Sequence, residues 1–510
     1  MVQKPTLAGA SEDMIDRRTF MALMAAAAAS PARGEAQGFS RDWLIGRAEE
    51  LSKSDYVARP LIPEPWRELT YDEFQHIWFN SQKGIWTDTE RPLHIDLFTA
   101  GLYVERPVKI HLVENGQATT LEYDISLFDR TDQFPDLPID ETMGYSGLRL
   151  RAELNKPEIF EEFAVFQGAS YFRAIGNGQT YGLSARGLAL RTADPNGEEF
   201  PDFTDFWIEA PAHGTSEYIL HALLDSPSVT GAYQFAITPG ATTRMQVTAT
   251  LFPRVDLTHV GLGSLTSMFL FDETNRHRFD DFRPAVHDSE GLMIVNGNGE
   301  RLWRALGNHA RVEVSAFVDK NPQGFGLMQR DRDPESYADL EAHYEARPSL
   351  WITPGEAWGE GAVELVEIPA DKEIYDNIVA YWRPRAPMPT GARQDFTYNM
   401  AWGDEPDGLP DVARVINTRI GKGFDQIKTV IAIDFAPHPD LEGDVEDVNI
   451  ILRGTSGEVS PAILQKNPGT GGLRMNFSIL PGDARFIDLR AQLYRDGKPV
   501  TEVWLYRWTA

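Results

Sequence analysis

The chain has 510 residues, of which 42% are hydrophobic and 24% are charged, so it is long enough for two or three globular domains. Lysine and arginine number 48 against 76 aspartate and glutamate residues, which gives a net charge of −28. Such an acidic surface repels phosphate backbones and anionic lipid head groups, so nucleic acids and membrane surfaces are poor partner candidates. The absence of cysteine excludes disulfides, thiolate nucleophiles and cysteine-bound zinc.

The N-terminus has the pattern of an export signal. Arg17 and Arg18 are followed by an alanine-rich, mildly apolar run that is too short to span a bilayer. Small residues end at Ala36, which offers a cleavage site after that residue. This pattern is typical of the twin-arginine route. We therefore expect residues 1–36 to be removed and the product to be periplasmic, with no later segment inserted in a membrane.

The mature chain has mainly the pattern of strands and turns. Helical spacing behind a serine N-cap at Ser40 predicts a helix over residues 40–53. Two alternating apolar runs within residues 231–252, joined by Pro239 and Gly240, predict a β-hairpin. Residues 333–347 are a candidate second helix.

A change of domain is predicted near residues 383–395, which contain three prolines and one glycine. About seven short strands follow within about 115 residues, a number typical of an immunoglobulin-like sandwich. We therefore expect a signal peptide at 1–36, a large β-sandwich domain at 37–384, a linker at 385–395 and an immunoglobulin-like domain at 396–510. The fold class is mainly β.

Several common chemistries have no motif in this chain. The sequence has no P-loop, no dinucleotide glycine fingerprint, no H-E-x-x-H or H-x-H pattern and no G-x-S-x-G elbow. Aromatic residues make up 11% of the chain, and their flat faces suit the C–H faces of sugar rings. Because β-sandwich cores also consume aromatic residues, composition alone favours a carbohydrate ligand only slightly.

Two aspartates are candidates for acid–base chemistry. Asp376 lies in the strand-like segment KEIYDNIVAYWRP (372–384), where Ile374 and Ile378 would share its face. Such neighbours would raise its pKa by desolvation, as a general acid requires. Asp288 lies in a more polar segment, and the ionised form that a general base requires is favoured there.

Each candidate also has a structural interpretation. An aspartate at the end of a strand often accepts hydrogen bonds from backbone N–H groups and takes no part in chemistry. The neighbours of Asp288 include His287 and Arg283, and His287 by itself more often stabilises a structure by hydrogen bonding than it carries a proton. The residues alone therefore leave the role of both carboxylates open.

The segments LTSMFLF, FRPAVHDSEGL, GFGLMQRDR and VEIPADKEIYDNIVAYWRP resemble the periplasmic glucan biosynthesis proteins G and D. The resemblance extends over about residues 38–510, and the twin-arginine signal resembles the D branch more than the G branch. It implies a large galactose-mutarotase-like β-sandwich followed by a small immunoglobulin-like β-sandwich.

The resemblance also implies an activity, which is inverting endo-cleavage of the β-1,2-glucose backbone of osmoregulated periplasmic glucans. Asp376 matches the family's general acid, and Asp288 matches the base, which acts through a relay of water and a substrate hydroxyl. Neither a metal nor an organic cofactor is implied. The residues expected to hold glucose units are Tyr344, Arg347, His287 and Trp382.

Other functions stay open at this stage. One alternative is a transglycosylase or branching enzyme on the same glucan, and another is a non-catalytic glucan-binding scaffold that serves the membrane glucosyltransferase. A mutarotase-like epimerase follows only from analogy between folds, which carries little weight. A homodimer is compatible with the chain, although no sequence feature predicts it.

Overall fold

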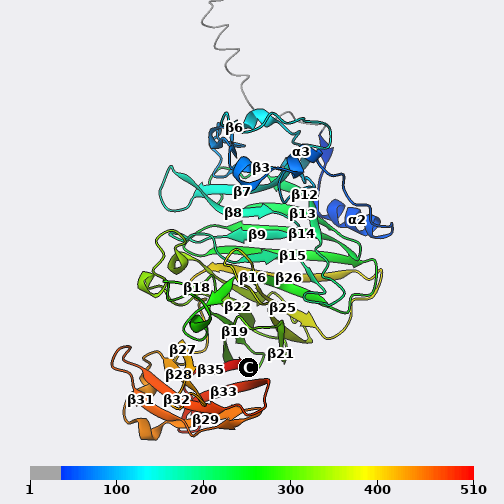
Figure 1. The fold of residues 1–510 in the computed structure, drawn as a ribbon. Coiled ribbons are helices and arrows are strands. Elements are labelled where there is room, and N and C mark those ends of the chain that lie inside the picture. Colours follow the sequence, from blue (N-terminus) through cyan, green and yellow to red (C-terminus); the bar gives the residue numbers. More distant parts are fainter. Residues whose placement is uncertain (1–35) are drawn as a thin grey trace, which may run out of the picture.

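The structure is a computed structural model that describes residues 36–510. The signal peptide expected at 1–36 therefore lies outside the described residues, except for Ala36. Figure 1 shows a large β-rich body with a smaller β-rich domain at one end. No helix within residues 36–510 is long and apolar enough to cross a bilayer.

The largest sheet has 16 strands and continues from the large domain into the small one. Strand β34 (Lys498–Pro499) extends it beside β33. The other strands, in spatial order, are β1 (Gln37–Gly38), β5 (Gln117–Thr120), β4 (Lys109–Glu114), β12 (Asp202–Glu209), β13 (Tyr218–Asp225), β14 (Val229–Thr238), β15 (Thr243–Pro253), β26 (Gln394–Gly403), β23 (Ser349–Pro354), β22 (Gly324–Met328), β19 (Gly291–Val295), β20 (Arg301–Ala305), β35 (Val503–Thr509), β33 (Phe486–Arg495) and β29 (Asn449–Gly454).

A second sheet of ten strands covers the first, and smaller sheets complete the fold. The ten strands are β21 (Glu313–Lys320), β24 (Glu360–Glu367), β25 (Ile378–Pro384), β16 (Val260–Ser267), β10 (Ser184–Arg186), β9 (Tyr171–Ala174), β8 (Phe160–Gln167), β7 (Tyr145–Glu153), β3 (His94–Thr99) and β11 (Ala189–Leu190). The five-stranded sheet contains β27 (Val415–Lys422), β28 (Thr429–Phe435), β32 (Leu473–Leu480), β30 (Glu458–Val459) and β31 (Ile463–Lys466). The two short pairs are β17 (Phe269–Phe271) with β18 (Val286–His287), and β2 (Ile77–Phe79) with β6 (Phe128–Arg130).

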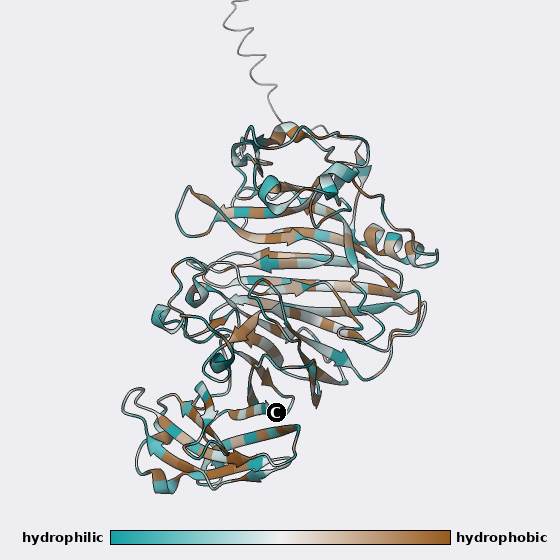
Figure 2. Cartoon of the chain, in the orientation of Figure 1, coloured by the Kyte–Doolittle hydropathy of each residue, from teal (hydrophilic) through white to brown (hydrophobic). Residues whose placement is uncertain are grey.

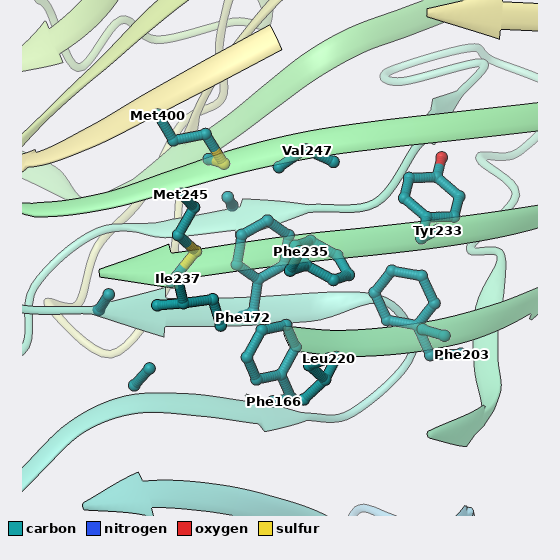
Figure 3. Close-up of a cluster of buried hydrophobic side chains, with 14 of the residues drawn as sticks. Phe166, Phe172, Phe203, Leu220, Tyr233, Phe235, Ile237, Met245, Val247 and Met400 are labelled. Carbon is teal, nitrogen blue, oxygen red and sulfur yellow. The ribbon is translucent and has the colours of Figure 1, made fainter. Parts of the chain in front are cut away.

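Aromatic side chains hold the two main sheets together. Phe166 and Phe172 of the ten-stranded sheet contact Phe235 of the sixteen-stranded sheet, with ring centroids 5.2 and 5.1 Å away (Figure 3). Hydrophobic and hydrophilic residues alternate along these strands (Figure 2), as expected where one face of a sheet is buried. The predicted hairpin is confirmed, because β14 and β15 pair in antiparallel register through residues 229–253.

One of the two predicted helices is confirmed. Helix α2 (Arg41–Ser52) begins after Ser40, whose hydroxyl accepts a hydrogen bond from the Trp43 amide at 3.1 Å. Short helices α3 (Glu64–Arg67) and α4 (Tyr71–Phe74) follow it.

The predicted helix at 333–347 is wrong. That segment forms two 3-10 turns at Pro334–Ser336 and Tyr344–Ala346. Asp333 and Asp339 accept hydrogen bonds from nearby backbone amides there, and such bonds compete with a continuous helix.

The boundary between the domains differs from the prediction. Strand β26 pairs with β15 and β23 of the large sheet, so the large domain continues to Gly403 and does not end at residue 384. The segment predicted as an inter-domain linker, 385–395, connects β25 to β26 within the large domain. Met388 in this segment forms backbone bridges to Leu257. Proline content identified a loop there, but not which sheets the loop connects.

The two domains share strands and cores. Strand β35 pairs in parallel with β20, with Leu302 opposite Val503. One face of the β19–β20 region packs in the large core, and its other face, which includes Trp303, packs in the core of the small domain. In that small core Phe477 of the five-stranded sheet contacts Trp504 of β35. The mainly β fold class is confirmed, while the galactose-mutarotase-like and immunoglobulin-like assignments stay predictions.

Candidate functional site

Asp376 lies in an exposed turn and not inside a strand. Strand β25 begins only at Ile378, and residues 371–376 are exposed. Ile374 is 75% exposed, so the predicted apolar environment from flanking isoleucines is wrong. The side chain of Asp376 keeps 32% of its surface open, which makes this carboxyl reachable by a ligand.

Asn377 anchors the turn that carries Asp376. Its amide oxygen accepts a hydrogen bond from the backbone N–H of Phe269 at 2.8 Å, and its NH2 group donates to the Phe269 carbonyl at 2.9 Å. The backbone N–H of Asp288 donates at 2.8 Å to the carbonyl of Met268, which directly precedes Phe269 in the chain. One short segment after β16 therefore positions both aspartates.

Asp288 is almost completely buried, with 6% of its side chain exposed. Its Oδ1 accepts a hydrogen bond from Nη1 of Arg347. Burial raises the pKa of Asp288 to about 6, although the guanidinium of Arg347 opposes the shift, and the charge of Asp376 adds to it. The sequence suggested Arg283 as the neighbouring cation, whereas the structure places Arg347 there. Asp288 is still ionised at neutral pH.

Tyr344 and Arg347 lie together next to Asp288, as the resemblance implied. The guanidinium carbon of Arg347 lies 4.2 Å from the centroid of the Tyr344 ring. The Tyr344 hydroxyl donates to Glu373 Oε2 at 3.2 Å, and this residue belongs to the same turn as Asp376. Tyr344 is buried, so it orients Arg347 and the turn.

Three guanidinium groups act on Asp376. Nη2 of Arg173, on β9, lies 3.9 Å from Asp376 Oδ2. Burial in the surrounding protein raises the pKa of Asp376, while the positive charges of Arg173, Arg186 and Arg347 oppose that shift. Arg186 on β10 is fixed by a hydrogen bond to Thr266 at 2.9 Å. The site therefore combines two carboxylates with three arginines, of which Arg186 also pairs with Glu198 at 2.5 Å.

His287 and Trp382 are both buried, so neither side chain is open to a ligand in this structure, and their sugar-binding roles stay predictions. His287 is 3% exposed, its Nδ1 lies 2.9 Å from Gln329 Oε1, and burial lowers its pKa to about 4. Gln329 in turn donates to the carbonyls of His287 and Tyr344, at 3.0 Å each. Trp382 is fully buried in the core of the large domain because its strand is covered on that face.

The sequence reasoning missed several residues of the site, namely Arg173, Arg186, Asn377 and Glu373. Arg173 and Tyr171 alternate with buried residues on β9, which marks an outward face. Nothing local shows that this face meets the Asp376 turn, because β10 and β16 lie between β9 and β25 in the sheet. Asn377 has no local sequence signal either, because its burial and its hydrogen bonds to Phe269 are visible only in the structure.

A cavity of about 1180 Å³ lies elsewhere in the large domain, lined by residues that include Trp43, His111 and Trp207. Neither Asp288 nor Asp376 lines it. Within residues 36–510, no group of three or more histidine, aspartate or glutamate side chains is placed to hold a metal ion.

The fold and the site together define a two-domain β protein that presents an open and a buried carboxylate among arginines. The family model described as "Periplasmic glucan biosynthesis protein, MdoG" matches residues 39–508. The chain belongs to this family.

Relatives confirm the assignment over nearly the whole chain. The glucans biosynthesis protein G of Vibrio cholerae serotype O1 is 46% identical over 476 residues, covering 92% of this chain and 87% of that protein. The glucans biosynthesis protein G of Shewanella frigidimarina is 46% identical over 476 residues, with 92% and 85% covered. Both carry the name of the G branch, whereas the resemblance to the D branch depends on the N-terminal signal.

A solved structure also aligns with the chain. The Slr1438 protein from Synechocystis sp. PCC 6803 is 9% identical, with a TM-score of 0.18, over 69% of this chain and 100% of that one.

Proposed function

We propose that this protein cleaves the β-1,2-glucose backbone of osmoregulated periplasmic glucans as an inverting endo-glucanase. The observation that carries the proposal is the unequal exposure of the two carboxylates, 32% for the side chain of Asp376 and 6% for that of Asp288. An open carboxyl can touch a glycosidic oxygen. A buried carboxylate can take part only through a relay.

In this mechanism Asp376 gives its proton to the glycosidic oxygen as the bond from C1 to that oxygen breaks. A water molecule attacks C1 from the opposite face, which inverts the anomeric configuration. The proton of that water passes through a substrate hydroxyl and water to Asp288, which Arg347 holds in its ionised form. Exchange with solvent then restores both carboxyl groups.

Burial raises the pKa of both carboxyl groups. Asp288, whose pKa is about 6, is ionised at neutral pH and can accept a proton. The pKa of Asp376 is already raised in the free protein, and a bound sugar would remove water from its open side. Further desolvation disfavours the charged form, so the substrate itself would promote the protonated acid.

The test is product analysis on purified linear β-1,2-glucan. We expect shorter chains, and NMR should show that their new reducing ends have the α configuration. The cleavage rate of Asp376→Asn should be at least 100-fold lower than that of the native protein. Asp371→Asn is the matched control because it removes an exposed carboxylate from the same turn. Unchanged cleavage by Asp376→Asn would refute the acid assignment.

The other products identify the alternative functions. Ring-shaped or branched chains would show transglycosylation, and saturable binding without any product would show a scaffold for the membrane glucosyltransferase.

We also propose export by the twin-arginine route with cleavage after Ala36. Replacement of Arg17 and Arg18 by lysine should then leave an unprocessed precursor inside the cell, while the native chain gives a periplasmic product that begins at Gln37. We further propose that the protein forms a homodimer. The molar mass of the purified periplasmic product, measured by sedimentation, should then be twice that of one chain.

A further inference from the structure

Four open apolar side chains project from loops near the candidate site. Phe282 is 78% exposed, Leu340 84%, Ile374 75% and Tyr375 50%. We call these four residues the apolar rim. Single exposed apolar residues are normal on protein surfaces, so the rim has significance only if its members are gathered.

One arginine gathers the loops of the rim. Arg283 Nη1 lies 2.8 Å from Asp339 Oδ2 and 2.8 Å from Glu373 Oε2, and its Nη2 lies 2.9 Å from Asp281 Oδ2. Each of these three carboxylates directly precedes a rim residue in the sequence. Three loops that are distant in the chain therefore converge on one guanidinium group, and 14% of the Arg283 side chain remains exposed.

The rim adjoins the two carboxylates. Glu373 binds Arg283 on one side and accepts the hydrogen bond from the Tyr344 hydroxyl on the other. The ring of Tyr344 packs against the guanidinium of Arg347, and that guanidinium pairs with Asp288. In the turn that carries Asp376, the rim residue Tyr375 directly precedes that aspartate. A ligand that reaches Asp376 thus passes next to exposed aromatic and aliphatic surface.

The geometry points to the apolar rim as a sugar-binding subsite, where glucose units beside the cleaved bond pack their C–H faces on Phe282 and Tyr375. The inference rests on the glucan substrate of the proposed function, but not on cleavage. Aromatic rings offer flat apolar faces that suit such packing. The three loops are rich in carboxylates, and the whole chain carries −28, so a neutral polyhydroxylated ligand fits better than an anionic one.

The experiment measures binding without turnover. Linear β-1,2-glucan is titrated calorimetrically into Asp376→Asn, and into the same variant with Phe282→Ala and Tyr375→Ala added. We expect Kd to rise about tenfold, because loss of each ring face should raise Kd by about threefold and the two factors multiply. The control adds Tyr71→Ala and Tyr103→Ala, which also removes two exposed rings (61% and 84%) but leaves the rim intact.

The outcomes separate this inference from the proposed function. If the native protein cleaves glucan while Kd is the same in the rim and control variants, the subsite is refuted and the cleavage stands. If Kd rises as expected but no product forms at any pH, the subsite stands and the hydrolase proposal fails. A change in sedimentation of the rim variant with unchanged Kd would assign the rim to contact between protein copies, and would also refute the subsite. Because the replaced rings are exposed, melting temperatures should stay within about 1–2 °C of the parent.

Discussion

The charge of Arg173 on Asp376 provides the sharpest quantitative test of the acid assignment. The guanidinium of Arg173 lies 3.9 Å from Asp376 Oδ2, and its positive charge lowers the pKa of that carboxyl. Replacement of Arg173 by glutamine removes this charge and should therefore raise the pKa of Asp376. Without this charge the protonated form of Asp376 persists to higher pH. The alkaline limb of kcat/KM, where the general acid loses its proton, should therefore move to higher pH.

The size of the shift follows from the distance and the exposure. Two unit charges about 4 Å apart interact by about 1 kcal/mol in bulk water and by about 4 kcal/mol at the effective dielectric of a protein surface. Because 44% and 32% of these two side chains are exposed, we take the lower figure. About 1 kcal/mol corresponds to about 0.7 pH unit.

The assay follows release of reducing ends from linear β-1,2-glucan between pH 4 and 10, at low substrate concentration and constant ionic strength. The shift should shrink in 1 M salt, where exposed charges are screened. Arg244→Gln is the control, since Arg244 forms a pair of similar length with Asp407, at 3.8 Å, that is more exposed and does not involve Asp376. An alkaline limb that stays in place, or that moves to lower pH, would show that Asp376 is not the titrating acid.

Three further variants test other parts of the structure. Arg347→Gln should raise the pKa of Asp288 above about 6, so the acidic limb of kcat/KM should move to higher pH, which the same assay measures. Trp382→Ala should lower the free energy of unfolding by about 3–5 kcal/mol in urea titrations while the folded fraction binds glucan normally, because the ring lies in the core. Glu502→Gln should cost about 3–5 kcal/mol of stability by calorimetry, since Glu502 is fully buried and pairs with Arg330. A small loss for either buried variant, or a Trp382→Ala protein that is stable but no longer binds, would contradict these assignments.

The features that the sequence predicted correctly are those that depend on local pattern. The hairpin at 231–252 alternates apolar residues around a Pro-Gly turn, and helix α2 begins at a serine that caps it. Both elements contain the information for their own formation within a short stretch of chain. Asp376 and Asp288 were candidates from their own segments and matched the family motif, and one segment after β16 positions both.

The features that the sequence did not predict depend on pairing between distant segments. Strand β26 has the same pattern as the strands of the small domain, and only its partners β15 and β23 show that it belongs to the large one. Arg173 lies about two hundred residues from Asp376 in the chain, and the order of strands in the sheet is what brings them together. Ile374 was misjudged because an alternating pattern does not reveal where a strand begins.

The parallel pairing of β20 with β35 has a consequence for biosynthesis. Strand β35 follows β20 by about two hundred residues in the chain, so the edge of β20 that pairs with it stays open while those residues are translated. During that time the outer face around Trp303 lacks the partner that finally covers it. A chain that stops before β35 would keep this edge and this apolar face exposed together. Such a product should accumulate as aggregate even though nearly all of the large domain has been synthesised.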